Sequence, residues 1–454
     1  MERISVARRS AAGAGRRLTA TLRLAAGLAA ICVLPQKAVA EAAPAGVAEA
    51  LQRIAVIAES PVQKRAAHEL WGRQLDAPTI LRDRSSGMSW RSDPATGAPL
   101  AVMLRKDQPP ANTCIDVEGA PHVTLLLPLP TDSSALAALY WHEQWHCIQT
   151  GLGLPASEGN TAHLDSEAGR TWLRLEMRAL ARALATGDDA QARKHFAAAL
   201  RFRALRGGTG APGTDALAEE AKLERNEGLA EYTGRSVAAA GAQGDGVAAV
   251  VDALAKAESS ESFVRSAAYA TGPAYGMLLD RWSPGWRSAL SAGTSLPVLL
   301  ADRIRSSPAN IDVARVGQRY GMDQVRAEER ARAEERERRS AALRVRLLGE
   351  DAVRFPLKQP ALSFDPRSLF PLDSVGTVYT PVTVRDDWGE LTADSGGLLL
   401  PDWSQISVGG GAIKGCNNSW RGPGWTLELE PGWRFSRHPS GWQLTKEDPL
   451  PCSK

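Results

Sequence analysis

A stretch very rich in arginine and glutamate, residues 324–348, divides the chain into two parts of different composition. Charged pairs such as Glu328 and Arg332 recur in it at a spacing of four residues. Side chains four residues apart lie on one face of a helix, where opposite charges attract each other. We therefore predict a solvated connecting helix within residues 316–348, with a separate domain on either side. Because its positive and negative charges nearly cancel, we do not expect this helix to bind nucleic acid.

The part before this helix, residues 41–315, is predicted to form a mainly helical domain with a small sheet. Short apolar runs alternate with Gly, Pro and Asp in residues 76–130, a pattern typical of strands. The chain then becomes helical, beginning with a helix that is capped by Asp132 or Ser133 and ends near Thr150. The other predicted helices lie within residues 45–75 and over residues 165–186, 190–205, 214–240 and 247–267.

The part after the connecting helix, residues 349–454, is predicted to form a small β-rich domain of sandwich or barrel type. Pro, Gly and Trp are frequent here, and β-like runs cover residues 376–384, 397–400, 426–429 and 441–444. The tryptophans are expected mainly in the core, with a glycan- or peptide-binding face as the alternative; they are Trp388, Trp403, Trp420, Trp425, Trp433 and Trp442. The chain as a whole is therefore predicted to have an α+β fold.

The first forty residues have the pattern of a secretory signal peptide. Arginines come first, an apolar stretch from Leu24 to Leu34 follows, and cleavage is predicted after Ala40. The apolar stretch is shorter than the roughly 20 residues that span a bilayer, so a signal peptide is favoured over a membrane anchor. No later segment is long and apolar enough to span a membrane. We predict export to the periplasm or outside the cell. The arginines of this segment inflate the formal net charge of +3, so the mature chain is close to neutral and nucleic acid is not expected as a partner.

Four cysteines remain after the predicted cleavage: Cys114, Cys147, Cys416 and Cys452. Disulfides form in the oxidising compartments that exported proteins enter. Four cysteines allow three pairings, and buried free thiols are the alternative. We favour Cys416 with Cys452, since both lie in the last segment, which leaves Cys114 to pair with Cys147.

The sequence His142-Glu143-Gln144-Trp145-His146 is the feature with the clearest chemistry. Two histidines four residues apart on a helix lie on the same face, so both can bind one zinc ion. A glutamate directly after the first histidine points toward the place of a zinc-bound water and can accept its proton. We predict one zinc ion per chain, with Glu143 as the general base.

A second motif follows downstream, Asn226-Glu227-Gly228-Leu229-Ala230-Glu231-Tyr232. Together the two motifs resemble the gluzincin metallopeptidases, in which a glutamate from a later helix completes the zinc site. The resemblance covers residues 132–232 and implies that Glu227 is the third ligand. Glu231, four residues further on, could orient a ligating histidine or be solvated.

The spacing between the two motifs is longer than is common in gluzincins, which leaves a second candidate for the third ligand. Glu176 is closer to His146 in sequence and lies on a strongly predicted helix. Its neighbours Arg174 and Arg178 offer another interpretation, a structural carboxylate paired with arginine.

The resemblance also implies a Tyr or His that donates a hydrogen bond to the oxyanion formed during hydrolysis. We favour Tyr269, and the other candidates are Tyr232, Tyr275 and His163. Tyr269 and Tyr275 flank residues 270–274, which are predicted to be a break between two helices facing a cleft. The strand Val123–Leu127 is predicted to be the edge that binds an extended substrate backbone.

These observations predict an exported zinc-dependent metallopeptidase that acts on peptide or protein substrates. A zinc hydrolase for another amide, such as a cell-wall peptide, uses the same residues. The alternative of a different class is a non-catalytic exported binding or scaffold protein with a degenerate or structural metal site. The intact Glu143 favours the enzyme, because a structural site has no use for a base beside the metal. The oligomeric state is not predicted.

Overall fold

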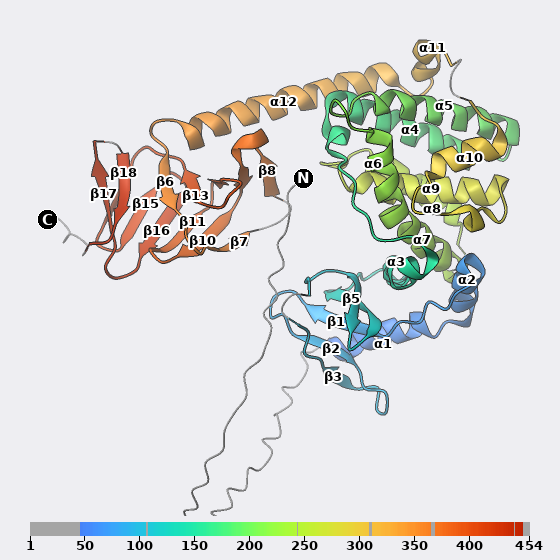
Figure 1. Cartoon of the computed structure of the whole chain (residues 1–454), viewed down its shortest axis with the longest axis horizontal. Helices are drawn as coiled ribbons and strands as arrows, with labels where there is room; N and C mark the ends of the chain where they lie inside the picture. The colour runs from blue at the N-terminus through green and yellow to red at the C-terminus, as the bar shows by residue number, and fades with distance from the viewer. Residues whose placement is uncertain are drawn as a thin grey trace, which may run out of the picture.

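The computed structural model describes residues 46–105, 108–242, 244–307, 311–364, 368–439 and 441–447. A mainly helical region with a small sheet comes first, and a β-rich region follows (Figure 1), so the predicted α+β fold is confirmed. The predicted signal peptide lies outside the described residues. Within the described ranges, no helix has the length and apolar character needed to cross a membrane.

The chain begins with two short helices and a five-stranded sheet. Pro61 opens the second helix, where the Ser60 side chain accepts a hydrogen bond from the Gln63 backbone, as is typical of a helix start. The elements are α1 (Val47–Ala58), α2 (Pro61–Trp71), β1 (Thr79–Asp83), β2 (Ser89–Ser92), β3 (Pro99–Ala101), β4 (Thr113–Val117) and β5 (Ala120–Leu127). The strand order is β3-β2-β1-β5-β4, with β1 and β5 parallel and the other neighbours antiparallel.

This strand order corrects the prediction for the substrate-binding edge. Val123–Leu127 lies in β5, which is paired on both sides, with β1 and with β4. The edge strand is instead β4, which has no strand partner on its other side among the described residues. The apolar run of β5 reflects its central position, since Val123 and Leu125 are fully buried.

A bundle of helices follows the sheet. The Asp132 side chain caps α3 by accepting a hydrogen bond from the Ala135 backbone, as predicted. The helices are α3 (Ser133–Gln149), α4 (Glu167–Ala185), α5 (Asp189–Gly207), α6 (Ala216–Leu223), α7 (Leu229–Ala242), α8 (Gly246–Ala257), α9 (Ser266–Trp282), α10 (Leu296–Ile304) and α11 (Val313–Gln318). Short turns of 3-10 helix are η1 (Thr150–Leu152), η2 (Ala162–Asp165) and η4 (Trp286–Ala289), and a π-helical turn, η3 (Glu224–Gly228), joins α6 to α7.

Two predictions about this bundle are wrong. The helix expected up to residue 267 ends at Ala257, and the break expected at residues 270–274 is the middle of the continuous helix α9. Pro273 lies inside α9, yet it and its neighbours are buried in the bundle. A Cβ atom on Gly272 would lie 2.3 Å from the Cα atom of Gly228, so the two backbones touch. This close packing outweighs the local cost of the proline.

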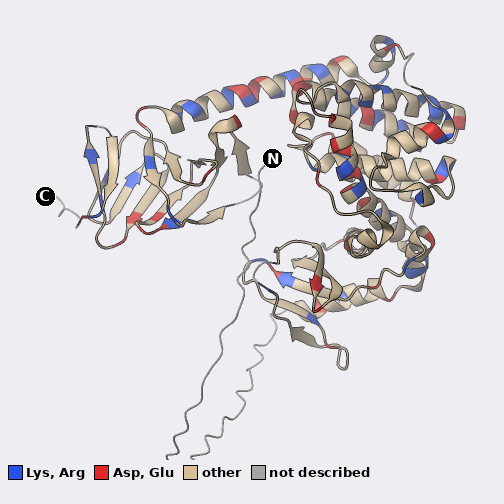
Figure 2. Ribbon diagram, in the orientation of Figure 1, with Lys and Arg blue, Asp and Glu red and all other residues tan. Residues whose placement is uncertain are grey.

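Helix α12 (Met322–Leu348) connects the two regions, as predicted, and carries both charges along its length (Figure 2). Its first half is not simply solvated. Glu329 is buried and binds Arg170 and Arg174 of α4. Glu328 binds Arg174 at 2.7 Å, so the pairing predicted between Glu328 and Arg332 is wrong. Glu328 pairs with Arg174 of α4 rather than with Arg332 of its own helix because α12 packs directly on α4.

The β-rich region has two sheets and a hairpin, and apolar residues of both sheets share one core. Trp388 and Trp425 are buried in this core as predicted, whereas Trp403 is 47% exposed. One sheet has the order β14-β15-β16-β11-β10-β7, the other β6-β13-β12-β9-β8, and the hairpin is β17-β18. The strands are β6 (Val353–Pro356), β7 (Ala361–Phe364), β8 (Leu369–Pro371), β9 (Thr377–Tyr379), β10 (Val382–Asp386), β11 (Gly389–Ala393), β12 (Gly397–Leu399), β13 (Gln405–Val408), β14 (Lys414–Cys416), β15 (Ser419–Gly422), β16 (Trp425–Leu429), β17 (Arg434–His438) and β18 (Gly441–Thr445), with a 3-10 turn η6 (Asp373–Val375).

A disulfide joins Cys114 of β4 to Cys147 of α3, which confirms that predicted pairing. Cys452, the predicted partner of Cys416, lies outside the described residues. The bond ties the edge strand of the sheet to the residue that follows His146.

Removing this disulfide is expected to destabilise the chain. Its cysteines are 33 residues apart in sequence, and closing a loop of that length restricts the unfolded chain by about 3–4 kcal/mol. A variant with Cys114→Ser and Cys147→Ser should therefore unfold at a lower urea concentration than the wild type. The same urea midpoint in both proteins would contradict this expectation. Peptide mapping of the unreduced wild type provides the control that the bond has formed.

Candidate metal centre

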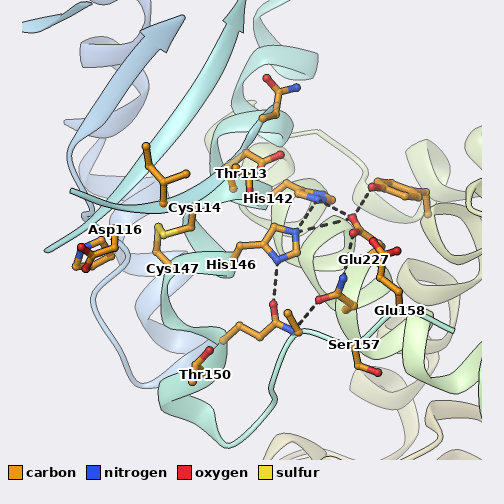
Figure 3. A pocket seen from close by; sticks show the side chains of 18 of the residues that line it. Thr113, Cys114, Asp116, His142, His146, Cys147, Thr150, Ser157, Glu158 and Glu227 are labelled. Carbon is orange, nitrogen blue, oxygen red and sulfur yellow. Dashed lines mark hydrogen bonds and ion pairs between the residues drawn. A yellow bond between two sulfur atoms is a disulfide. The ribbon is translucent and has the colours of Figure 1, made fainter. Parts of the chain in front are cut away.

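Three predicted ligand side chains converge between α3 and the π-helical turn η3 (Figure 3). The Nε2 atoms of His142 and His146 are 3.2 Å apart. The Oε2 atom of Glu227 lies 3.5 Å from Nε2 of His142 and 3.8 Å from Nε2 of His146. Ligands about 2 Å from a zinc ion, at the tetrahedral angle, are roughly 3.3 Å from one another. The three side chains therefore fit a single metal ion.

The π-helical turn places Glu227 beside the two histidines. It contains one more residue per turn than an α-helix, and such turns occur often at functional sites. Gly228 allows the turn to approach α9, because a Cβ atom there would lie 2.9 Å from the Cα atom of Gly272. The turn continues into α7, where a Cβ atom on Gly234 would lie 2.3 Å from the backbone oxygen of Ala138 in α3. Small residues on both faces thus hold this helix tightly between α3 and α9.

Glu176, the alternative third ligand, lies elsewhere. It is fully buried and accepts hydrogen bonds from Arg203, Arg206 and Tyr275. The interpretation of Glu176 as a structural carboxylate agrees with this position, but its partners are not the arginines next to it in sequence. Arg174 binds Glu328 and Glu329, and Arg178 binds Glu258.

Hydrogen bonds to Nδ1 orient both histidine rings. Nδ1 of His142 is 3.0 Å from Oε2 of Glu231, the residue that was expected either to orient a histidine or to be solvated. Nδ1 of His146 is 2.9 Å from Oε1 of Gln149. Both partners are oxygen acceptors, so both Nδ1 atoms donate, and each Nε2 is directed to the centre, where it can bind a metal ion once it is deprotonated.

Two amide side chains link His146 to Glu227, and sequence reasoning missed both. Nε2 of Gln149 donates to Oδ1 of Asn226 at 2.9 Å, and Nδ2 of Asn226 donates to Oε1 of Glu227 at 3.1 Å. Figure 3 marks these contacts as dashed lines between the labelled residues His146 and Glu227. The only signal in the sequence that could have identified them is their position, because Gln149 lies one helical turn after His146 and Asn226 directly precedes Glu227.

The electrostatics of these side chains favour a positive charge between them. Burial lowers the pKa of His142, but hydrogen bonds to Glu227 and Glu231 outweigh burial and raise this pKa to about 10. Burial raises the pKa of Glu227, but hydrogen bonds with His142, His146 and Tyr269 hold it well below its usual range. A bound cation meets the same electrostatic need.

Glu143 differs from these groups because one of its oxygens has no partner. Its Oε2 atom is buried and makes no hydrogen bond with any described residue. Burial raises the pKa of Glu143, while the nearby histidines act in the opposite direction. The side chain lines two neighbouring cavities, of about 590 and 310 Å³. An unsatisfied carboxylate oxygen at a cavity wall is suited to accept a proton from a molecule in that cavity.

Of the four candidate oxyanion donors, only Tyr269 lies at this centre. Its ring stacks on that of His142 with the centroids 5.6 Å apart, and its hydroxyl donates to Glu227. The others have distant partners: Tyr232 binds Asp280 and Arg287, Tyr275 binds Glu176, and His163 binds Glu220.

The centre forms one wall of a cleft between the small sheet and the helices. Residues 113–116 of β4 line the larger cavity on one side, and residues 156–158 and α9 line it on the other. The smaller cavity shares His142, Glu143 and Tyr269 with the larger one and extends toward Arg84. The cleft therefore continues past the metal centre in two directions, which suits an extended ligand.

No protein-family model, curated protein or solved structure matches this chain.

Proposed function

We propose that this chain is an exported zinc-dependent metallopeptidase that hydrolyses peptide bonds. One observation carries the proposal: the ligand atoms of His142, His146 and Glu227 converge at the wall of a cleft beside the unpaired carboxylate of Glu143. The disulfide between Cys114 and Cys147 supports export, because such bonds persist in oxidising compartments.

Each side chain has a distinct task in this proposal. His142, His146 and Glu227 hold the zinc ion, which supplies Lewis acidity that acidifies water and polarises a substrate carbonyl. Glu143 accepts a proton from the attacking water and returns it to the leaving amine. Tyr269 turns its hydroxyl from Glu227 to the oxygen of the substrate that gains negative charge.

The free edge of β4 favours a peptide as the substrate. One side of β4 has no strand partner among the described residues, where only the Asp116 carbonyl is known to accept a hydrogen bond from the Gln108 side chain, and residues 113–116 line the larger cavity. An extended peptide can pair with such an edge, so that its backbone is bound and a carbonyl lies near the metal ligands. The disulfide keeps this edge at a fixed place beside α3.

The alternative is a binding or scaffold protein with a structural metal site. Structural zinc sites are usually closed by four protein ligands, whereas three side chains converge here within the described part of the chain. A structural site also gives no reason for an unpaired carboxylate oxygen on Glu143. Both observations favour the enzyme.

Measurements of zinc content and peptide cleavage test the proposal. We expect one zinc ion per chain in the wild type and none in His146→Ala, while His68→Ala, at an exposed histidine of α2, keeps it. The wild type should cleave a mixed peptide library, lose this activity with a chelator and regain it with added zinc. A folded wild type that binds no zinc from a zinc-containing buffer would refute the proposal.

A further inference from the structure

Arg265 lies at the start of α9 and bridges two carboxylates with very different exposure. Its Nη2 atom is 2.6 Å from Oε1 of Glu227, whose side chain is only 6% exposed. Its Nη1 atom is 2.6 Å from Oε1 of Glu158, whose side chain is 72% exposed. One nitrogen of the guanidinium therefore contacts Glu227, a buried member of the candidate metal site, and the other contacts Glu158, which solvent can also reach.

Arg265 is also the one lysine or arginine among the described residues that line the larger cavity. The acidic residues in that lining are Asp116, Glu143, Glu158 and Glu227. Apart from the zinc ion of the proposed function, Arg265 is therefore the one fixed positive charge that a ligand meets among these lining residues. A planar guanidinium is well suited to bind a carboxylate, so an anionic group of the ligand away from the cleaved bond would be attracted to Arg265.

Given the proposed peptidase function, on which this step rests, we propose that Arg265 binds a carboxylate of the substrate and that Glu158 occupies this position in the free protein. Glu158 can separate from Arg265 at little cost in free energy, because its carboxylate is exposed to water whether or not it contacts Arg265. The contact with Glu227 keeps the guanidinium in place during this exchange. Glu158 thus shows where and how a carboxylate binds.

The position of Arg265 limits which carboxylate can bind. The guanidinium contacts one oxygen of Glu227, while the other oxygen of Glu227 faces the two histidines. An extended peptide advances by roughly 3.3–3.6 Å per residue, so the bound carboxylate belongs to a residue about one or two positions from the cleaved bond. It is either the C-terminal carboxylate of the peptide or the side chain of an aspartate or glutamate.

Matched peptides distinguish these two sources. The first pair has one sequence with a free or an amidated C-terminus, and the second has blocked ends and either Glu or Gln near the cleaved bond. We expect the carboxylate member of one pair to be cleaved with a kcat/KM about tenfold higher than its neutral match. In Arg265→Gln this ratio should fall to about 1. A ratio within a pair is used because a weaker metal site lowers the rates for both peptides.

A second variant avoids the contact with Glu227. Glu158→Gln removes the competing carboxylate, so it should bind the preferred peptide a few-fold more tightly than the wild type does. Calorimetric binding to zinc-loaded Glu143→Gln protein, with and without Glu158→Gln, measures this without turnover. Equal cleavage within both pairs by the wild type would overturn the role of Arg265 and leave the peptidase intact. If zinc-loaded Glu143→Gln protein binds the carboxylate member of a pair about tenfold more tightly than its neutral match, while the wild type cleaves neither peptide, the peptidase would be overturned and the carboxylate site would remain.

Discussion

Glu143→Gln is expected to lower kcat/KM for peptide cleavage by about 10²–10⁴-fold, the usual contribution of a general base. Glutamine has nearly the same size but cannot accept the proton of the attacking water. Glu143 does not belong to the group of three that converges on the metal position, so the variant should bind one zinc ion as the wild type does. Steady-state rates on one peptide substrate, together with zinc content, measure both expectations.

The control for this variant is Glu69→Gln, at an exposed glutamate of α2 far from the cleft in sequence. It should leave both the rate and the zinc content unchanged. If zinc-loaded Glu143→Gln cleaved peptides at the wild-type rate, another group would have to accept the proton. The unpaired Oε2 atom of Glu143 would then need a different explanation, such as a buried water.

The local part of the site was predictable because its geometry follows from helix periodicity. His142, Glu143 and His146 lie within one helix, and Asp132 caps it as its sequence indicates. Glu227 depended on the resemblance of a short motif, because the sequence alone left Glu176 as an alternative. The structure brings Glu227 to the histidines through a π-helical turn, a feature that leaves no periodic pattern in the sequence.

The parts that could not be predicted depend on contacts between distant segments. The substrate-binding edge was assigned to Val123–Leu127 because this strand comes just before the helix of His142, whereas the pairing of β5 with β4 and β1 on either side makes it central. The break expected around Pro273 does not occur, because Gly272 packs on Gly228 from another helix. Neither partner of such a contact can be recognised from its own neighbours in sequence.

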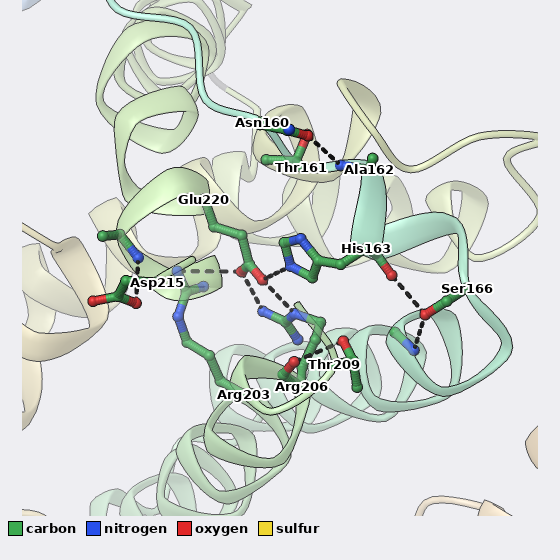
Figure 4. Close-up of polar contacts among 12 residues, drawn as sticks. Asn160, Thr161, Ala162, His163, Ser166, Arg203, Arg206, Thr209, Asp215 and Glu220 are labelled. Carbon is green, nitrogen blue, oxygen red and sulfur yellow. Dashed lines mark hydrogen bonds and ion pairs between the residues drawn. The ribbon is translucent and has the colours of Figure 1, made fainter. Parts of the chain in front are cut away.

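A buried cluster of charged side chains also depends on contacts between distant segments, and Figure 4 shows its residues Arg203, Arg206 and Glu220. Arg203 and Arg206 of α5 are buried with carboxylates from α4, α6 and η3, namely Glu176, Glu220 and Glu224. Burial lowers the pKa of Arg206, but the negative charges of Glu176 and Glu220 outweigh burial and raise this pKa above its usual value. Burial raises the pKa of Glu220, but Arg206 and Arg203 hold it well below its usual range. The contact between Arg206 and Glu220 therefore favours the charged form of both side chains.

This cluster also supports the position of Glu227. Glu224 lies in the same π-helical turn and accepts hydrogen bonds from Arg203 at 2.8 and 2.9 Å and from Thr271 of α9 at 2.9 Å. The turn is thereby fixed to α5 and α9 at the residue one turn before Glu227. Two glutamates that the sequence could not separate as ligands thus lie in different places, since Glu227 faces the two histidines of the candidate metal site and Glu176 contacts the arginines of the buried cluster.

Glu227→Ala and Glu176→Ala should therefore have different effects, the first on zinc content and the second on stability. Glu227→Ala is expected to lose the zinc ion while remaining folded, because two histidines alone bind zinc much more weakly than three ligands do. Glu176→Ala is expected to lower the free energy of unfolding by about 3–5 kcal/mol, because it leaves the fully buried Arg206 short of a carboxylate partner. The folded fraction of Glu176→Ala should still bind one zinc ion per chain.

Zinc content and urea unfolding of the two variants, measured side by side, separate these tasks. Glu176→Gln provides a milder variant if Glu176→Ala does not fold, since its amide oxygen still accepts a hydrogen bond from Arg206 while the charge is lost. A folded Glu176→Gln without zinc, beside a zinc-loaded Glu227→Ala, would reverse the assignment of the third ligand. Loss of zinc from Glu227→Ala alone would leave Glu176 with the structural task, because a carboxylate that binds two buried arginines cannot also turn toward the histidines.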